Sequence, residues 1–201
     1  MFYSRLKLIV IPALAMMFFG MAIASVHAED WSSLSKKKVT TLGLYMTAEQ
    51  AGKYVADHAD KTLFVDVRTA AELTYLGTPA VTDAHVPFEM MDATQWNDKK
   101  SVYKHNINPN FVADVTARLE KKGLTKTDTV FLMCRSGNRS AKGVNLLAAA
   151  GYSNVYNVVD GYEGDKSKTA PNKGKRTVNG WKNSGLPWTY SLDRDIMYLR
   201  K

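Results

Sequence analysis

Two short apolar runs, each followed by a loop and a segment with helical spacing, constrain the fold of this chain most strongly. The runs cover residues 62–67 and 129–133, and both are apolar at most positions instead of at every second one. Such runs are typical of strands that are buried on both faces of a parallel sheet. They therefore predict a mainly parallel central sheet with helices on both of its faces.

Helical patterns alternate with these strands along the chain. Thr47 and Gln50 have the spacing of a capping box, which predicts the start of a helix. Further helices are expected from Asn108, which precedes a proline suited to the first helical position, and after Ser140, which we expect to cap its helix. Another strand is predicted at 154–159. The alternation predicts an α/β sandwich, in which ligands bind beyond the carboxyl ends of the strands.

Three segments lack a clear period. Residues 29–45 are polar and predict an irregular N-terminal segment, and residues 77–100 are rich in turn formers, with one short strand near 84–86. Residues 163–180 predict a basic loop, because the part at 166–176 holds five cations and no acids. Such a loop can be a simple solvated excursion, or it can attract anions.

The first 28 residues have the pattern of a secretory signal peptide. Arg5 and Lys7 precede an apolar run at 8–24, and the small residues at 26–28 suit a signal peptidase. We expect cleavage before Glu29, which places the mature protein in the periplasm or outside the cell without stable membrane association. The alternative is an uncleaved anchor, since the run of 17 residues is near the lower limit for spanning a bilayer.

Length and charge limit the classes of function. Without its first 28 residues, the chain keeps 173, enough for a single domain, which we place at 46–201. The lost segment carries two cations and no acids, so the net charge falls from +8 to +6. A modest positive charge favours an anionic substrate or partner. No dense arginine tract alternates with aromatic residues, so nucleic acid is not expected as a partner.

Cys134 is the only cysteine, and it directly follows the strand predicted at 129–133. It cannot form an intramolecular disulfide, and a lone thiol in an oxidising compartment is a liability unless it has a chemical role. The residues from there to Ser140 are small, polar or cationic, and Gly137 permits a tight backbone turn. A sulfur there would face backbone N–H groups at a helix N-terminus, where a thiolate is favoured. The alternative is a buried, inert cysteine.

Four motifs in this order resemble those of the rhodanese, or thiosulfate sulfurtransferase, family. The resemblance covers roughly residues 46–187 and implies a single-domain, exported member with a rhodanese-like three-layer sandwich. Ala84, Phe88 and Asp160 depart from it, because the family commonly has glycine there. The motifs are Asp66-Val67-Arg68 with Glu72, Ala84-His85-Val86-Pro87, the run from Cys134 to Ser140, and Asp160-Gly161-Tyr162 with Trp181 and Gly185-Leu186-Pro187.

The resemblance implies sulfur transfer. Cys134 would take a sulfane sulfur from a small anionic donor such as thiosulfate, hold it as a persulfide, and pass it to a thiol or to cyanide. Backbone N–H groups of the loop, with two arginines, would surround the negative charge. The expected substrate-binding residues are Arg135, Ser136, Gly137, Asn138, Arg139 and Ser140.

The other candidate site residues are charged residues and histidines. In the family, Asp66 and Arg68 are similar to a charge pair that braces the active loop, and His85 to a structural residue. Neither His85 nor His58 lies at metal-ligand spacing from a cysteine or carboxylate, so we expect no metal and no other cofactor. The basic loop could also dock an acidic protein partner.

Two other classes of protein remain open. A cysteine-dependent phosphatase or arsenate reductase uses a cysteine and an arginine with five residues between them, whereas four residues separate Cys134 from Arg139. A non-catalytic rhodanese-like binding module is the second alternative, although such modules typically lack the cysteine.

Overall fold

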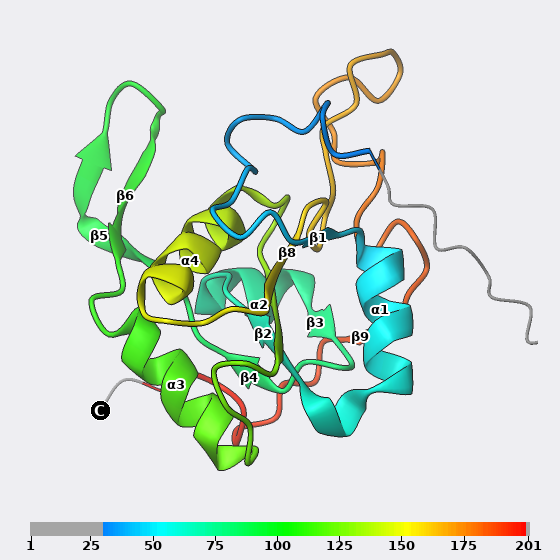
Figure 1. Cartoon of the computed structure of the whole chain (residues 1–201). Helices are drawn as coiled ribbons and strands as arrows, with labels where there is room; N and C mark the ends of the chain where they lie inside the picture. The colour runs from blue at the N-terminus through cyan, green and yellow to red at the C-terminus, as the bar shows by residue number, and fades with distance from the viewer. Residues whose placement is uncertain (1–29, 200–201) are drawn as a thin grey trace, which may run out of the picture. The chain divides into compact units, whose positions relative to one another are not determined.

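The computed structural model describes residues 30–199 (Figure 1). The predicted signal peptide lies outside these residues. Within them, none of the helices combines the length and the apolar character that a membrane span requires.

A five-stranded sheet forms the centre of the domain. Its order is β1-β8-β7-β2-β4, and all neighbouring strands are parallel. All residues of β2 and β7 are buried, which confirms the interpretation of the two apolar runs as inner strands. The segment at 29–45 was predicted to be irregular, but its last residue belongs to the short edge strand β1. The strands are β1 (Tyr45–Met46), β2 (Thr62–Asp66), β4 (Ala84–His85), β7 (Thr129–Met133) and β8 (Val155–Val158).

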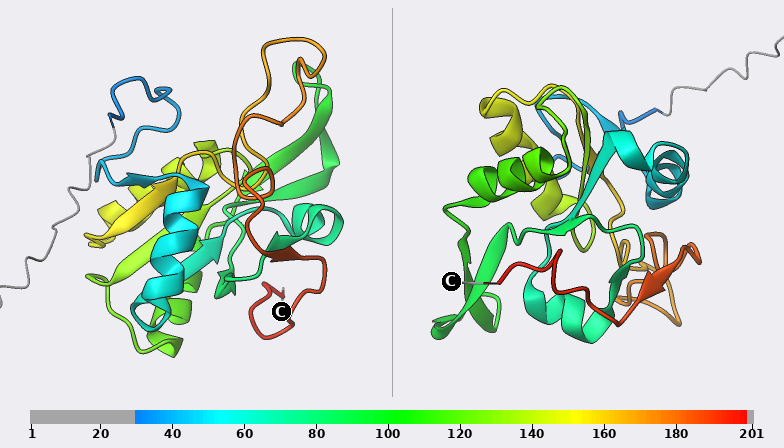
Figure 2. Two further views of the ribbon diagram at one scale, coloured as in Figure 1. Left: turned by 90° about the vertical axis from the view of Figure 1, so that its right-hand side faces the viewer. Right: turned by 90° about the horizontal axis from the view of Figure 1, so that it is seen from below.

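Helices cover both faces of this sheet, which confirms the predicted α/β sandwich (Figure 2). One apolar core lies under α3 (Phe111–Lys121) and α4 (Asn138–Ala149). A second core lies on the other face, where α1 (Ala48–Asp57) packs with the buried ring of Trp181. The capping box expected at the start of α1 is present. The remaining helices are α2 (Ala70–Leu76) and the short 3₁₀ helix η1 (Ala59–Lys61).

Two helix starts differ from the predicted ones. The helix α4 begins at Asn138 after Gly137, whose φ of 85° ends the loop in a left-handed conformation. Ser140 is therefore not the cap but a residue of the first turn, and its hydroxyl reaches Cys134 and Asn157 instead. The helix α3 begins at Phe111, because the side chain of Asn108 first forms a turn by accepting a hydrogen bond from the Asn110 N–H.

The segment at 77–100 was predicted to be largely irregular, and this was wrong. It contains β3 (Thr78–Pro79), which pairs with β9 (Trp188–Thr189), and β5 (Glu89–Asn97), which pairs with β6 (Val102–Ile107) as an antiparallel hairpin. The hairpin projects from the body of the domain (Figure 1). Its polar and charged residues are mixed among the apolar ones on exposed strands, so the sequence shows no period of buried residues.

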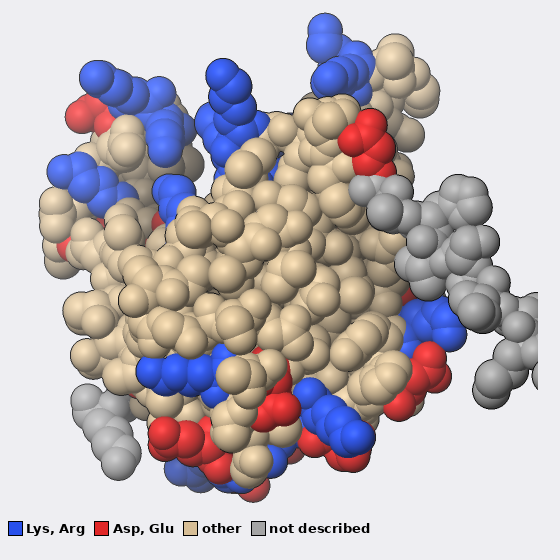
Figure 3. All heavy atoms as spheres, viewed as in Figure 1, with Lys and Arg blue, Asp and Glu red and all other residues tan. Residues whose placement is uncertain are grey.

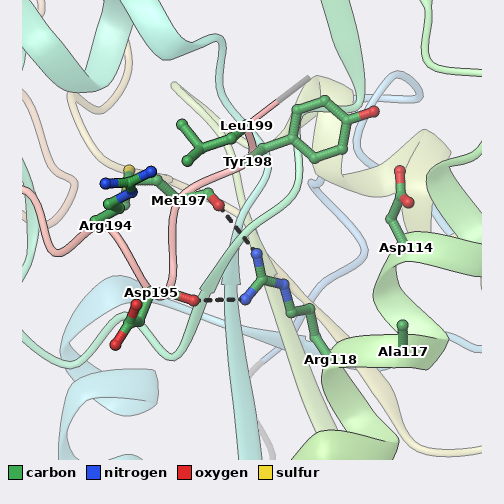
Figure 4. A pocket seen from close by; sticks show the side chains of 8 residues that line it. All are labelled: Asp114, Ala117, Arg118, Arg194, Asp195, Met197, Tyr198 and Leu199. Carbon is green, nitrogen blue, oxygen red and sulfur yellow. Dashed lines mark hydrogen bonds between the residues drawn. The ribbon is translucent and has the colours of Figure 1, made fainter. Parts of the chain in front are cut away.

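The C-terminal segment covers the edge strand β4. The His85 N–H donates to the Ile196 carbonyl at 2.8 Å, and the Tyr198 N–H donates to Nδ1 of His85 at 3.3 Å. Arg118 of α3 donates to the carbonyls of Asp195 and Met197, beside a hollow of about 370 Å³ (Figure 4). These contacts satisfy backbone groups that would otherwise form an open sheet edge.

Candidate active site

Cys134 lies directly beyond the carboxyl end of β7, and its side chain is only 1% exposed. The hydroxyl of Ser140 is 3.3 Å from the sulfur and 2.7 Å from Oδ1 of Asn157. Because a hydroxyl has one proton, Ser140 can donate to only one of these acceptors at a time. The site therefore holds a buried thiol beside a donor that can turn toward it.

The loop around Cys134 is fixed by the residues that follow β8. The N–H of Tyr162 donates to the Cys134 carbonyl at 2.8 Å. Gly161 has a φ of 64°, and a Cβ atom there would lie 2.5 Å from the same carbonyl. At Gly137, a Cβ atom would overlap the carbonyl of Val159. Glycine is therefore needed at both positions, because the two backbones pass so closely.

Arg139 turns toward α2 and forms an ion pair there. Its guanidinium donates to both carboxylate oxygens of Glu72, with 2.7 Å between Nη1 and Oε2, and its Nε lies 3.7 Å from Glu89. Burial alone would raise the pKa of Glu72, but the hydrogen bonds and charge of Arg139 outweigh it and lower that pKa to about 2. The guanidinium of Arg139 is thus held between the carboxylates of Glu72 and Glu89.

The other predicted loop residues differ in exposure. The side chain of Arg135 is 46% exposed and donates to the carboxylate of Glu163. Asn138 is exposed, whereas Ser136 and Gly137 are buried. The loop therefore presents one cationic and one amide side chain to solvent, above a layer of buried backbone.

Asp66 and Arg68 form a fully buried ion pair, with 2.6 Å between Oδ2 and Nη2. Arg68 also donates to the Gly77 carbonyl at 2.7 Å, and its guanidinium carbon lies 3.8 Å from the ring centre of Tyr162. Since the Tyr162 N–H holds the Cys134 carbonyl, the pair lies one residue away from the active loop. Opposite charge, hydrogen bonds and ring contact together compensate the burial of the guanidinium.

The basic segment at 166–176 is an ordered excursion. Lys166 and Arg176 pair as an antiparallel bridge at its base, and the Ser167 N–H donates to the Lys175 carbonyl at 2.8 Å. The exposed cations of this excursion are Lys166, Lys168, Lys173 and Lys175, whereas Arg176 is half-buried.

Arg176 differs from those lysines, and sequence reasoning did not separate it from them. It donates to the Gly164 carbonyl, while its buried Nε has no hydrogen-bond partner among residues 30–199. Burial and the charge of Arg135 lower its pKa, and the charges of Glu163 and Cys134, among others, oppose that effect. The charge of Arg176 therefore interacts with the charges of Arg135 and Cys134. The signal available in sequence was a single arginine among lysines, because arginine tolerates partial burial better.

Histidines and carboxylates of the described chain do not gather into a metal site. Residues 30–199 hold no group of three or more His, Cys, Asp and Glu side chains that could bind a metal ion. His85 is held by the Arg68 carbonyl and the Tyr198 N–H, as a structural residue would be. His58 ends α1 and stacks on Tyr54, with 4.4 Å between the ring centres.

The fold and this loop define a class of protein. A family model of the rhodanese-like domain matches residues 47–168, and the chain belongs to that family. It is 30% identical over 131 residues to uncharacterized proteins of Rickettsia prowazekii (strain Madrid E) and Rickettsia conorii, which covers 65% of this chain and 85% of each relative. It is also similar to the crystal structure of Rv0390 from M. tuberculosis, with 29% identity, a TM-score of 0.54, and coverage of 73% of this chain and 96% of that one.

Proposed function

We propose that this protein is a sulfurtransferase that moves a sulfane sulfur from an anionic donor such as thiosulfate to a thiol or cyanide. The observation that carries the proposal is the buried Cys134 sulfur in the strand-loop-helix turn of a rhodanese-like domain, 3.3 Å from the Ser140 hydroxyl. A single buried thiol with a donor at this distance suits a reaction in which the sulfur carries negative charge at each stage.

The reaction would use two displacements. The Cys134 thiolate attacks the outer sulfur of thiosulfate, a new S–S bond forms, and sulfite leaves with the electron pair of the broken S–S bond. The acceptor thiolate or cyanide then attacks the outer sulfur of the persulfide, and the electron pair of that bond returns to Cys134. No external oxidant is needed, because each bond that forms replaces one that breaks.

Four side chains have roles in this proposal. Ser140 turns its proton from Asn157 toward the anionic sulfur. Arg135 and Arg176 would hold the oxyanion of the donor, because Arg135 is exposed on the active loop and Arg176, whose charge interacts with that of Cys134, has no ion-pair partner among the described residues. Arg139 positions the loop through Glu72 and does not bind the donor.

The geometry disfavours the phosphatase alternative. A phosphate cradle needs the loop arginine free to take two oxygens of the substrate, and Arg139 already gives its paired donors to Glu72. The non-catalytic alternative is disfavoured by the presence of Cys134 beside a polar partner, since an inert cysteine is normally surrounded by apolar groups.

Intact mass tests the proposal. Incubation with thiosulfate should add one sulfur atom to the native protein, and cyanide should remove it. Cys134→Ser should add no sulfur and lose turnover, while Ser140→Ala should retain the adduct and react more slowly. Hydrolysis of an aryl phosphate should be far slower than sulfur transfer under matched conditions. Thiosulfate:cyanide activity near the native level in Cys134→Ser would end the proposal.

We also propose that the protein is exported. The support is the basic start at Arg5 and Lys7, the apolar run at 8–24 and the small residues before Glu29. N-terminal sequencing of protein from its native host should begin at Glu29, in the periplasmic or secreted fraction. A chain that starts at Met1 and sediments with membranes would contradict this.

A further inference from the structure

Two arms leave the sheet edge that carries Cys134. The hairpin arm, residues 89–107, starts four residues after β4, and the basic arm, residues 166–176, follows β8. All five strands are parallel, so both arms leave from the carboxyl ends. In the sheet order β8-β7-β2-β4, the strand before Cys134 lies between the two strands that lead to the arms. The left view of Figure 2 shows both arms rising in the same direction.

The hairpin arm has a surface without a partner in the described fold. Its two strands pair only with each other, and every residue of β6 is exposed. The rings of Trp96 and Tyr103 meet edge to face at 5.3 Å on this surface. An isolated two-stranded hairpin is marginally stable in water, and clustered exposed apolar side chains mark interaction sites. The exposed large apolar residues of the arm are Met91, Trp96, Val102, Tyr103 and Ile107.

The outer part of both arms is cationic. Residues 93–104 of the hairpin arm carry three lysines and one acid, and the basic arm carries five cations and no acid. Of the two acids nearer the base of the hairpin, Glu89 contacts His105 and Arg139, and Asp92 accepts hydrogen bonds from Thr94, Gln95 and Asn106. Figure 3 shows Lys and Arg side chains gathered on both arms along this side of the molecule.

The hairpin arm is continuous with the active site. Glu89 at its base lies 3.7 Å from Arg139 of the active loop. Glu89 also lines a hollow of about 390 Å³ on the arm, together with His105, Lys100, Tyr103 and Lys104. A segment seated in this hollow would meet two lysines, an aromatic ring and the pair of Glu89 and His105, and would lead toward Arg139 of the active loop.

We propose that the two arms form a docking surface for an acidic protein, and that a thiol of this protein exchanges sulfur with Cys134. The proposal rests on the proposed sulfurtransferase activity. Charge complementarity selects an acidic partner, and the aromatic pair favours a protein over a polyanion, because aromatic residues supply the buried centre of protein interfaces. The atoms balance as above, since the partner thiolate takes the outer persulfide sulfur and Cys134 regains its electron pair.

Two synthetic peptides of equal length serve as probes. Each has one central cysteine, flanked by Asp and Glu in the first and by Lys in the second. Thiosulfate is kept at saturation, and transfer to each peptide and to cyanide is followed by mass and by sulfite release. Copies with serine in place of cysteine report binding alone through fluorescence anisotropy.

A charge reversal of the hairpin arm is the decisive variant. Lys99→Glu, Lys100→Glu and Lys104→Glu are combined, and the control reverses Lys53, Lys61 and Lys121, which lie on α1, before β2 and on α3. For the acidic peptide, kcat/KM should fall about tenfold in the hairpin variant at low ionic strength. Cyanide turnover should stay unchanged in both variants. Trp96→Ala should weaken binding of the acidic serine peptide without salt dependence.

The outcomes separate the two proposals. Absence of thiosulfate:cyanide turnover in the native protein contradicts the proposed function, while the serine peptides still test docking. Equal use of the acidic and basic peptides, or an equal loss in the control variant, overturns the docking proposal. Heparin binding as tight as that of the acidic serine peptide, unaffected by Trp96→Ala, also overturns it, because the arms would then be a site for any polyanion.

Discussion

The charges that follow β2 and those that follow β8 are arranged in opposite ways. After β2, Asp66 and Arg68 are fully buried against each other, and Glu72 pairs with Arg139. After β8, the lysines of the basic arm have no ion-pair partner among residues 30–199. A buried charge is tolerated only with a partner, whereas an exposed charge remains free to attract solutes. The charges after β2 therefore hold the active loop in place, and we propose that the exposed lysines after β8 attract anions toward it.

The largest expected effect comes from breaking the buried pair. Arg68→Met leaves the Asp66 carboxylate buried without its partner, so the free energy of unfolding should fall by about 3–5 kcal/mol, measured by urea denaturation. The control is Lys53→Met, which breaks the exposed pair with Asp57 and should change stability little. Equal effects of the two substitutions would contradict the distinction between buried and exposed charges.

The next effect tests the close contact that joins the active loop to the residues after β8. Gly137→Ala should cost at least about 2 kcal/mol and slow sulfur transfer, because the new Cβ overlaps the Val159 carbonyl in a left-handed conformation. Gly151 has a similar φ of 89° with nothing within 4 Å, so Gly151→Ala should cost only about 1 kcal/mol. Similar losses of stability and activity in both variants would show that the left-handed backbone conformation alone causes the loss, without a contribution from the contact with Val159.

A smaller effect is expected at the half-buried pair of Arg139 and Glu72. Glu72→Gln should destabilise the fold by about 2 kcal/mol at neutral pH. In the native protein, the pKa of Glu72 is lowered from 4.5 to about 2. Its contribution to stability is therefore complete above pH 4.5 and is lost as the pH falls toward 2. Urea midpoints measured across this range should show a weaker pH dependence in Glu72→Gln than in the native protein.

The smallest effect is expected in the basic arm. Changing Lys166, Lys168, Lys173 and Lys175 to Gln should lower kcat/KM for thiosulfate at low ionic strength and leave kcat unchanged. The difference should fade with salt, because exposed charges are screened over about 8 Å at physiological ionic strength. Arg176→Gln should instead raise KM at all salt concentrations, since its half-buried guanidinium is less screened and its charge interacts with that of Cys134. Steady-state kinetics at two ionic strengths measure both effects. An equal, salt-dependent loss of kcat/KM in both variants would contradict the distinction between the lysines and Arg176.

Much of the central fold was predictable from short stretches of sequence. The strand at 129–133 and the capping box at the start of α1 were predicted with the observed bounds or partners. The helix expected from Asn108 is also present as α3, although it begins at Phe111. These features depend on residue spacing within a few turns or one strand, so the information is local.

The hairpin arm and the individual roles of the arginines were decided by the tertiary structure. Arg139 contacts Glu72 across 67 residues of sequence, and Arg176 is half-buried because the basic arm folds back and its guanidinium donates to the Gly164 carbonyl. The sequence by itself determined the α/β sandwich and the place of its lone cysteine beyond a buried strand. Packing between distant segments decided which charges brace that cysteine and which face solvent. The reason is that the free energy of a charged side chain is set by its burial and its neighbours in space.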